Sequence, residues 1–163
     1  MLASVTLPGS PAPLTLGPAP DGLGQRLYAV DTTPGPESEY VATGGWRLLG
    51  LNPAALDVER QLQVTYLPRR LAVAPDGNHL YTLDAGGTTV LHHDLSTGGQ
   101  RSLARLRGEG VSLAVTATHV YVPNLYRSEV SAIDRRNGYT KAIPVGRRPT
   151  AIVVGGTIRL PSG

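Results

Sequence analysis

Short runs of alternating apolar and polar residues, closed by turn-forming residues, extend along most of the chain. The clearest stretch contains four such runs, at residues 71–74, 79–83, 88–93 and 101–107. The first run ends at the tripeptide Pro75-Asp76-Gly77, and Gly86-Gly87 follows the second. A period of two, closed by Pro, Asp and Gly, is typical of antiparallel strands joined by tight turns. The pattern therefore predicts four short strands in this stretch.

This four-strand unit recurs along the chain. Leu80–Asp84 returns forty residues later as Val120–Asn124 and occurs earlier as Leu27–Asp31. Asp94–Gly98 returns as Asp134–Gly138 at the same offset. Four antiparallel strands in about 40 residues is the size of one blade of a β-propeller, in which four-stranded sheets surround a central channel. We therefore predict an all-β fold built from propeller blades.

One stretch carries signals for a helix as well as for a strand. Asn52 followed by Pro53 is a typical helix start, and apolar residues at helical spacing follow it. Every second residue from Val58 to Tyr66 would instead share one face of a strand. Because the repeat places a turn and a strand here, we predict the strand.

The third unit resembles the YVTN-type β-propeller repeat. Tyr121–Asn124, Glu129–Asp134 and Ala142–Pro149 are similar to that family's strings Tyr-Val-Thr-Asn, Val-Ser-Val-Ile-Asp and Ile-Pro-Val-Gly-x-x-Pro, with Pro123 in place of Thr. Ala74–Gly77 nearly reproduces the Ser-Pro-Asp-Gly that follows the family's innermost strand. The resemblance covers almost all of the chain and implies the propeller fold. It implies no single activity, because such propellers occur in surface-layer proteins, lactonases and electron-transfer dehydrogenase subunits.

Counting repeats predicts how much of a propeller is present. We expect one partial propeller over residues 1–163, made of an outer strand at 3–8, blades at about 11–66, 67–107 and 110–146, and an incomplete blade at 149–163. These three and a half blades fall short of the four to eight of a closed propeller. The open arc would leave two apolar sheet faces exposed. We expect a second copy, a different chain or a missing remainder of the same protein to complete the ring.

Composition excludes several classes of function. The chain has no cysteine, which rules out disulfides, a cysteine nucleophile and thiolate metal sites. Its net charge is +3, with acidic residues interspersed, so it lacks the basic stripe of a nucleic-acid-binding protein. No apolar run has the length of a membrane span, and we expect no membrane insertion. The resemblance favours an extracytoplasmic location, whereas the first residues lack a signal-peptide pattern, so the compartment stays open.

The residues that most often carry chemistry do not form a recognisable catalytic or metal motif. His79 and His119 share a repeat position beside a turn, and His92 and His93 are adjacent on a strand, where their side chains point to opposite faces. The end of the second strand in each unit holds a polar residue, for which turn capping is the favoured role: Asp31, Asp84 and Asn124. We predict no catalytic residue, no metal site and no cofactor.

One face of the predicted propeller carries candidate binding residues. The connections between blades and the loops between second and third strands should lie together there. Their arginines are Arg69, Arg70, Arg107, Arg127, Arg147 and Arg148. Arginine suits bidentate recognition of an anion or of an acidic protein patch, although solvated turn positions are the simpler interpretation. A Pro- and Gly-rich insertion at residues 32–45 ends beside Trp46 and contains Tyr40, two aromatic side chains suited to anchor a partner.

Together these features favour a non-catalytic scaffold or accessory subunit of a larger assembly. It would close with a second chain or a missing segment and bind a protein partner or an anion on the loop face. The alternative is half of a propeller enzyme, lactonase-like or dehydrogenase-like by resemblance, that becomes active after ring closure.

Overall fold

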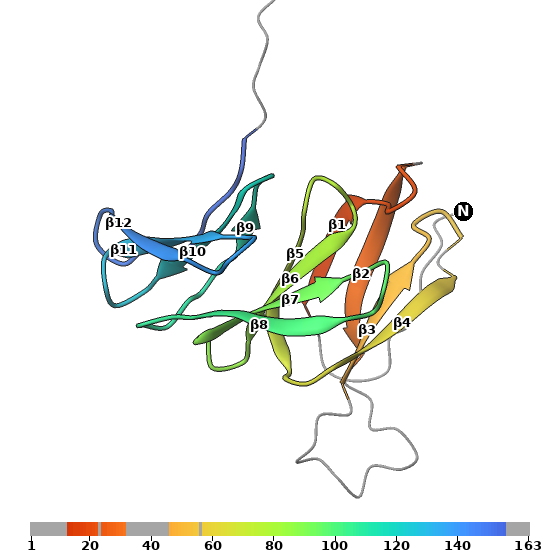
Figure 1. Ribbon diagram of the computed structural model, residues 1–163, viewed down its shortest axis with the longest axis horizontal. Coiled ribbons are helices and arrows are strands. Elements are labelled where there is room, and N and C mark those ends of the chain that lie inside the picture. The colour runs from red at the N-terminus through yellow and green to blue at the C-terminus, as the bar shows by residue number, and fades with distance from the viewer. Residues whose placement is uncertain (1–12, 23, 32–45, 56, 156–163) are drawn as a thin grey trace, which may run out of the picture.

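The computed structural model describes residues 13–22, 24–31, 46–55 and 57–155, which form twelve β-strands (Figure 1). Sheet A contains β1 (Leu14–Pro18), β2 (Gln25–Asp31), β3 (Trp46–Leu51) and β4 (Val58–Val64). Sheet B contains β5 (Pro68–Val73), β6 (His79–Asp84), β7 (Thr89–Asp94) and β8 (Gln100–Arg105). Sheet C contains β9 (Ala114–Val115), β10 (His119–Asn124), β11 (Glu129–Asp134) and β12 (Thr140–Pro144). Within these residues there is no helix that could cross a membrane.

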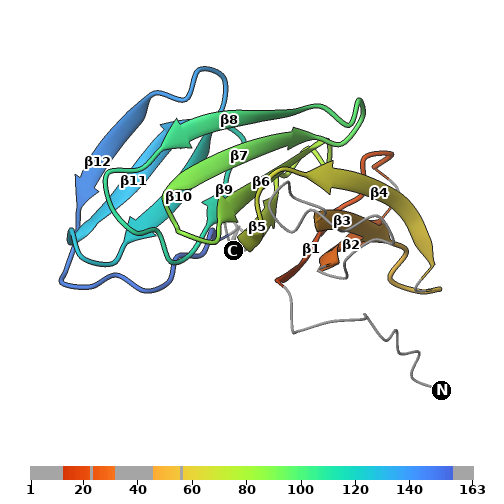
Figure 2. The same ribbon diagram turned by 90° about the horizontal axis from the view of Figure 1, so that it is seen from below.

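Each sheet is antiparallel, and its strands lie side by side in chain order. This arrangement confirms the all-β prediction and the four strands expected between residues 71 and 107. The three sheets stand next to one another, with the first strands β1, β5 and β9 toward the middle and the fourth strands toward the outside (Figure 2). The described sheets form an open arc, the geometry of an incomplete propeller.

The stretch after Asn52 forms a turn and then a strand, as the repeat predicted. The Oδ1 atom of Asn52 accepts hydrogen bonds from the backbone N–H groups of Ala54 (2.9 Å) and Ala55 (3.2 Å). This is the interaction that caps a helix, but here it closes the turn that leads into β4. β4 then pairs with β3 over its length, with a register shift between Gly50 and Leu51.

Several expected segments lie wholly or partly outside the described residues. The outer strand at 3–8 and the insertion at 32–45 with Tyr40 are among them. Residues 151–154, the expected first strand of the incomplete blade, are described and have no strand pairing. Their expected pairing partner at 157–160 lies outside the described residues, so this half-blade stays a prediction.

Two apolar seams hold the three sheets together. The A–B seam contains buried side chains from both sheets: Tyr28, Val30, Leu48, Val64, Leu71, Leu80 and Leu95. The B–C seam contains a second set, including Tyr81, Leu83, Val90, Val120, Val122 and Ile133. Successive strand residues point to opposite faces, so each central strand of sheet B supplies alternate residues to the seam on either side.

One repeat position closes each seam. Leu95, which follows the aspartate at the end of β7, is fully buried in the cluster that contains Tyr28 of sheet A. Arg135, forty residues later, donates a hydrogen bond of 2.8 Å from its Nε to the hydroxyl of Tyr81 in sheet B. In sheets B and C, the residue after the aspartate that ends the third strand thus joins the seam that contains the tyrosine of the preceding sheet. The third tyrosine of this series, Tyr121 in β10, faces away from sheet B.

Turn glycines permit the sheets to approach each other closely. Gly77 has a φ of +70°, and a Cβ there would lie 2.5 Å from the carbonyl oxygen of Ala19 in sheet A. Gly138 has a φ of +75°, and a Cβ there would collide with the carbonyl oxygen of Leu103 in sheet B. Both turns therefore need glycine for backbone conformation and for contact with the neighbouring sheet.

Candidate functional site

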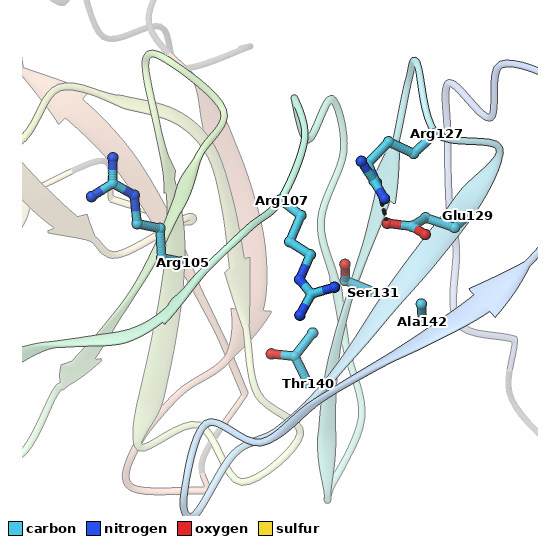
Figure 3. A pocket seen from close by; sticks show the side chains of 7 residues that line it. All are labelled: Arg105, Arg107, Arg127, Glu129, Ser131, Thr140 and Ala142. Atoms are coloured by element: carbon cyan, nitrogen blue, oxygen red, sulfur yellow. Dashed lines mark hydrogen bonds and ion pairs between the residues drawn. The ribbon is translucent and has the colours of Figure 1, made fainter.

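A cleft of about 250 Å³ opens between the outer strands of sheets B and C. Its lining residues are Arg105, Arg107, Arg127, Glu129, Ser131, Thr140 and Ala142 (Figure 3). The whole of β12 is exposed, which shows that the outer part of sheet C does not pack against sheet B and leaves the cleft open.

The wall from sheet C is set by strand register. Ser131 pairs with Val122 on one side and with Ala142 on the other, and Ile133 pairs with Thr140. Paired residues share a face, and Val122 and Ile133 are buried in the B–C seam. The side chains of Ser131, Ala142 and Thr140 therefore face sheet B, and they continue the seam outward with smaller and more polar groups.

The opposite wall comes from the end of β8 and the chain that follows it. The guanidinium of Arg107 points toward Ser131 and Thr140, whereas the guanidinium of Arg105 points away from them (Figure 3). Arg107 is exposed. Within the described part of the chain, no carboxylate forms an ion pair with it. Arg107 thus presents an uncompensated positive charge to the cleft.

A small hydrogen-bond network lies beneath this charge. The Nδ2 of Asn124 donates to the Oγ of Ser131 over 2.8 Å and lies 3.5 Å from the Oε1 of Glu129. The Nε of Arg127 donates to that same Glu129 oxygen over 3.0 Å. Asn124 is fully buried, and its Oδ1 has no hydrogen-bond partner among the described residues. The network fixes Ser131 and Glu129 on the cleft wall and neutralises Arg127.

The repeat position that holds Asn124 serves different roles in the three sheets. In sheet B, the Oδ1 of Asp84 accepts hydrogen bonds from the backbone N–H groups of Thr88 (2.6 Å) and Thr89 (2.8 Å). In sheet A, Asp31 forms an ion pair with Arg47 over 2.6 Å. Turn capping, the predicted role, is thus observed at Asp84.

The four other arginines of the predicted binding face lie outside the cleft, two at the start of β5 and two after β12. Arg69 forms an ion pair of 2.7 Å with Glu109, on the connection between sheets B and C. Arg70 donates to the carbonyl oxygen of Arg69 over 2.8 Å. Arg147 and Arg148 are exposed on the segment after β12. Of the six predicted arginines, the cleft contains Arg107 and Arg127.

Trp46, the other described residue of the predicted binding face, is the first residue of β3. It is partly buried and packs against the A–B seam. Its side chain therefore contributes to the packing of sheets A and B.

The histidines of sheet B form two contacts rather than one cluster. His93 is buried, and its Nε2 lies 2.9 Å from the Oγ1 of Thr82. The Nε2 of His92 lies 3.0 Å from the Nδ1 of His79 on the other face of the sheet. Burial lowers the pKa of His93 to about 4, and burial together with the charge of His79 lowers the pKa of His92 to about 4. In the described ranges, no three His, Cys, Asp or Glu side chains gather to hold a metal ion.

Residue-type motifs did not identify Ser131, Thr140 and Arg105 as parts of a site. The repeat carries a signal for one of them: Leu91 in sheet B is replaced at the same position by Ser131, forty residues later. A buried hydroxyl at a position where the preceding unit has leucine indicates a polar function or a polar partner.

Comparisons with known proteins establish the fold. No protein-family model and no curated protein sequence matches the chain, so the resemblance to the YVTN-type repeat stays a prediction. Solved structures do match. Hydrazine synthase of Kuenenia stuttgartiensis matches with a TM-score of 0.65 and 16% identity, over 93% of this chain and 41% of that one. Apo AztD from Citrobacter koseri matches with a TM-score of 0.63 and 18% identity, over 88% of this chain and 38% of that one.

A third similar structure is BBS1N, solved in complex with ARL6DN, with a TM-score of 0.60 and 17% identity. It is matched over 83% of this chain and 40% of its own. All three are β-propeller proteins, and the chain spans about 40% of their length. Because these neighbours include both scaffolds and enzymes or binding proteins, they establish the fold alone. The three sheets are those of an incomplete β-propeller.

Proposed function

We propose that this chain is a propeller segment that acts as an interaction scaffold, completed by further blades that dock on the outer faces of sheets A and C. The observation that carries the proposal is the repeated seam position. Leu95 closes the A–B seam near Tyr28, and Arg135 closes the B–C seam on Tyr81. Tyr121 repeats this tyrosine on the outer face of sheet C, where a next blade would place its own counterpart of Arg135.

Each outer face carries exposed apolar side chains, and the two faces differ from each other. On sheet A, strand register puts Leu14, Leu16 and Val58 on the face away from sheet B, where they are 59%, 50% and 46% exposed. On sheet C, Ile143 pairs with Val130 on the outer face and is 38% exposed. Faces of this kind are typical of surfaces that another protein covers.

A second copy of the chain fits these faces. In a propeller, the face of sheet C that receives a next blade is complementary to the face of sheet A that follows a preceding one. Two copies joined head to tail at both faces would form a closed ring. Their six described sheets fall within the four to eight blades of known propellers.

The test measures self-association. Sedimentation velocity of the 163-residue chain over a range of concentrations is expected to give the mass of a dimer. Ile143→Asp puts a charge in the outer face of sheet C and is expected to give a folded monomer, because an unpaired charge in an apolar interface costs several kcal/mol. Asn137→Asp adds the same charge in the exposed turn before β12 and should leave the dimer intact. A folded monomer of the unmodified chain at every concentration would contradict the proposal.

A further inference from the structure

We propose that the cleft between sheets B and C binds the carboxylate group of a small organic acid. Arg107 would be the principal cation, and Ser131 would donate a hydroxyl hydrogen bond. The site goes beyond the scaffold function and does not depend on ring completion, since both of its walls belong to the described sheets.

At one repeat position that lines the cleft, sheet C has a polar side chain where sheet B has an apolar one. In sheet B, Leu91 pairs with Thr82 and is buried on the face toward sheet A. In sheet C, Ser131 takes the same position, pairs with Val122 and is 4% exposed. A hydroxyl in this position loses the dispersion contacts of leucine and must be compensated by hydrogen bonds. The position thus combines a space that leucine would fill with a polar group inside it.

The hydrogen bond from Asn124 prepares Ser131 to act as a donor. A hydroxyl group has one proton and two acceptor lone pairs. The Oγ of Ser131 accepts from the Nδ2 of Asn124 over 2.8 Å, which uses one lone pair. The hydroxyl proton remains available on the cleft side, where an anion accepts hydrogen bonds. Thr140 lies on the same wall (Figure 3), but its hydroxyl donates to the carbonyl oxygen of Gly138 over 3.1 Å, so Ser131 is the hydroxyl donor of the site.

Arg107 supplies the positive charge that the Ser131 hydroxyl lacks. Its guanidinium reaches between Ser131 and Thr140 (Figure 3) and, within the described ranges, forms no ion pair. The planar guanidinium has five N–H donors, two of which match the two oxygens of a carboxylate. Arg127 also lines the cleft, but its Nε is bound to Glu129. Arg105 lines the cleft too, but its guanidinium points away from Ser131 (Figure 3). Arg107 is therefore the cation that is available to a ligand beside Ser131.

Charge and size select the ligand class. The charged residues of the lining are Arg105, Arg107, Arg127 and Glu129, with a net charge of +2. The guanidinium of Arg105 points away from the wall of sheet C (Figure 3), so the charge beside that wall is a single net positive charge, which one carboxylate neutralises. A doubly charged phosphate would leave excess negative charge beside Glu129. The volume of about 250 Å³ accommodates a small organic acid rather than a large cofactor. These features favour a monocarboxylate over a phosphate.

Nuclear magnetic resonance titration tests the site with defined probes. Benzoate, added at constant ionic strength and pH 7, is expected to shift the backbone amide signals of Arg107, Ser131 and Thr140 in a saturable manner. Benzamide has the same shape without the charge and is expected to leave them unchanged. Inorganic phosphate should bind more weakly than benzoate. Equal responses to benzoate and benzamide, stronger binding of phosphate, or no saturable shift would overturn the proposal.

Matched arginine variants separate the site from general surface charge. Arg107→Ala is expected to weaken benzoate binding by about tenfold or more, since hydrogen bonds to a charged group are lost. Arg107→Lys keeps the positive charge without the bidentate geometry. Its affinity for benzoate should lie between those of the parent protein and Arg107→Ala. Arg136→Ala removes an exposed arginine on the opposite turn of sheet C, whose side chain is 89% exposed, and should leave binding unchanged. Equal weakening by Arg107→Ala and Arg136→Ala would mean that net charge alone attracts the probe.

Glu129→Gln is expected to strengthen the binding of benzoate, whereas the Arg107 variants weaken it. The substitution removes the negative charge beside the cleft and releases Arg127 from its ion pair of 3.0 Å. Benzoate should then bind several-fold more tightly, and phosphate should gain more than benzoate because the net charge of the cleft rises by one. Unchanged or weaker binding of both anions in this variant would show that the cleft does not hold them.

Discussion

Replacing Arg135 with alanine is expected to lower the free energy of unfolding by about 3 kcal/mol, because several charge-assisted hydrogen bonds are lost together. The Arg135 side chain, 9% exposed, joins sheet C to sheet B. Its guanidinium donates to the Asp76 carboxylate (2.6 Å), the Tyr81 hydroxyl (2.8 Å) and the carbonyl oxygens of Thr116 (3.1 Å) and Ala117 (2.6 Å). Truncation would leave two backbone carbonyls and a tyrosine hydroxyl without this donor. Urea denaturation monitored by circular dichroism measures the change.

Two control variants test whether the loss of stability is specific to the Arg135 side chain. Arg136→Ala removes the next arginine along the chain, which is exposed and forms a 3.5 Å ion pair with Asp134. An exposed pair of this kind is worth at most about 1 kcal/mol, so this variant should stay close to the parent. Arg135→Leu copies Leu95 of sheet B and should recover part of the loss through packing on Tyr81. Equal effects of the two alanine variants would show that Arg135 does not hold the seam.

Acidification is expected to destabilise the protein between pH 6.5 and pH 4 through His93. Burial lowers the pKa of this histidine to about 4, below the value of about 6.5 of an unfolded chain. The unfolded state therefore binds more protons than the folded state in this window, and stability falls as the pH falls. Between pH 7 and pH 5 the loss due to His93 is about 2 kcal/mol. Urea denaturation at both pH values measures it.

Sheet C provides the matched replacement for this test. The positions of Thr82 and His93 correspond to Val122 and Ile133, forty residues later. The double variant Thr82→Val, His93→Ile removes the buried imidazole and its hydroxyl partner together, so that neither is left unpaired. Its loss of stability between pH 7 and pH 5 should be smaller by about 2 kcal/mol. Thr82→Val alone keeps the imidazole and should retain the steep dependence. Parallel pH dependences in the double variant and the parent would exclude His93 as the cause.

The fold was predictable because it depends on local pattern and repetition. Alternation gave the strands, Pro75-Asp76-Gly77 marked a turn, and the offset of forty residues grouped the strands into sheets. Even the ambiguous stretch after Asn52 was resolved by its place in the repeat, since the same side-chain interaction serves a helix cap and a tight turn.

The cleft was only partly predictable. Arg107 and Arg127 were expected on one face from the order of strands, and both line the cleft. Ser131 was not expected there, because its contact with Asn124 and its position opposite Arg107 depend on how the two sheets diverge. Arg135 was not identified as a seam residue, since Leu95 at the same repeat position has a different chemistry. Such contacts between blades are set by three-dimensional packing, which strand periodicity does not encode.

The order of the sheets has a consequence for folding. Most pairings are between strands that are adjacent in the chain, so each sheet forms largely from contacts that are local in sequence. In such an array, the energy of each unit is the sum of its own stability and its contacts with immediate neighbours. Sheet B has a neighbour on both faces among the described sheets. Sheet B therefore gains contact energy on both of its faces, and we expect it to be the last of the described sheets to lose its structure.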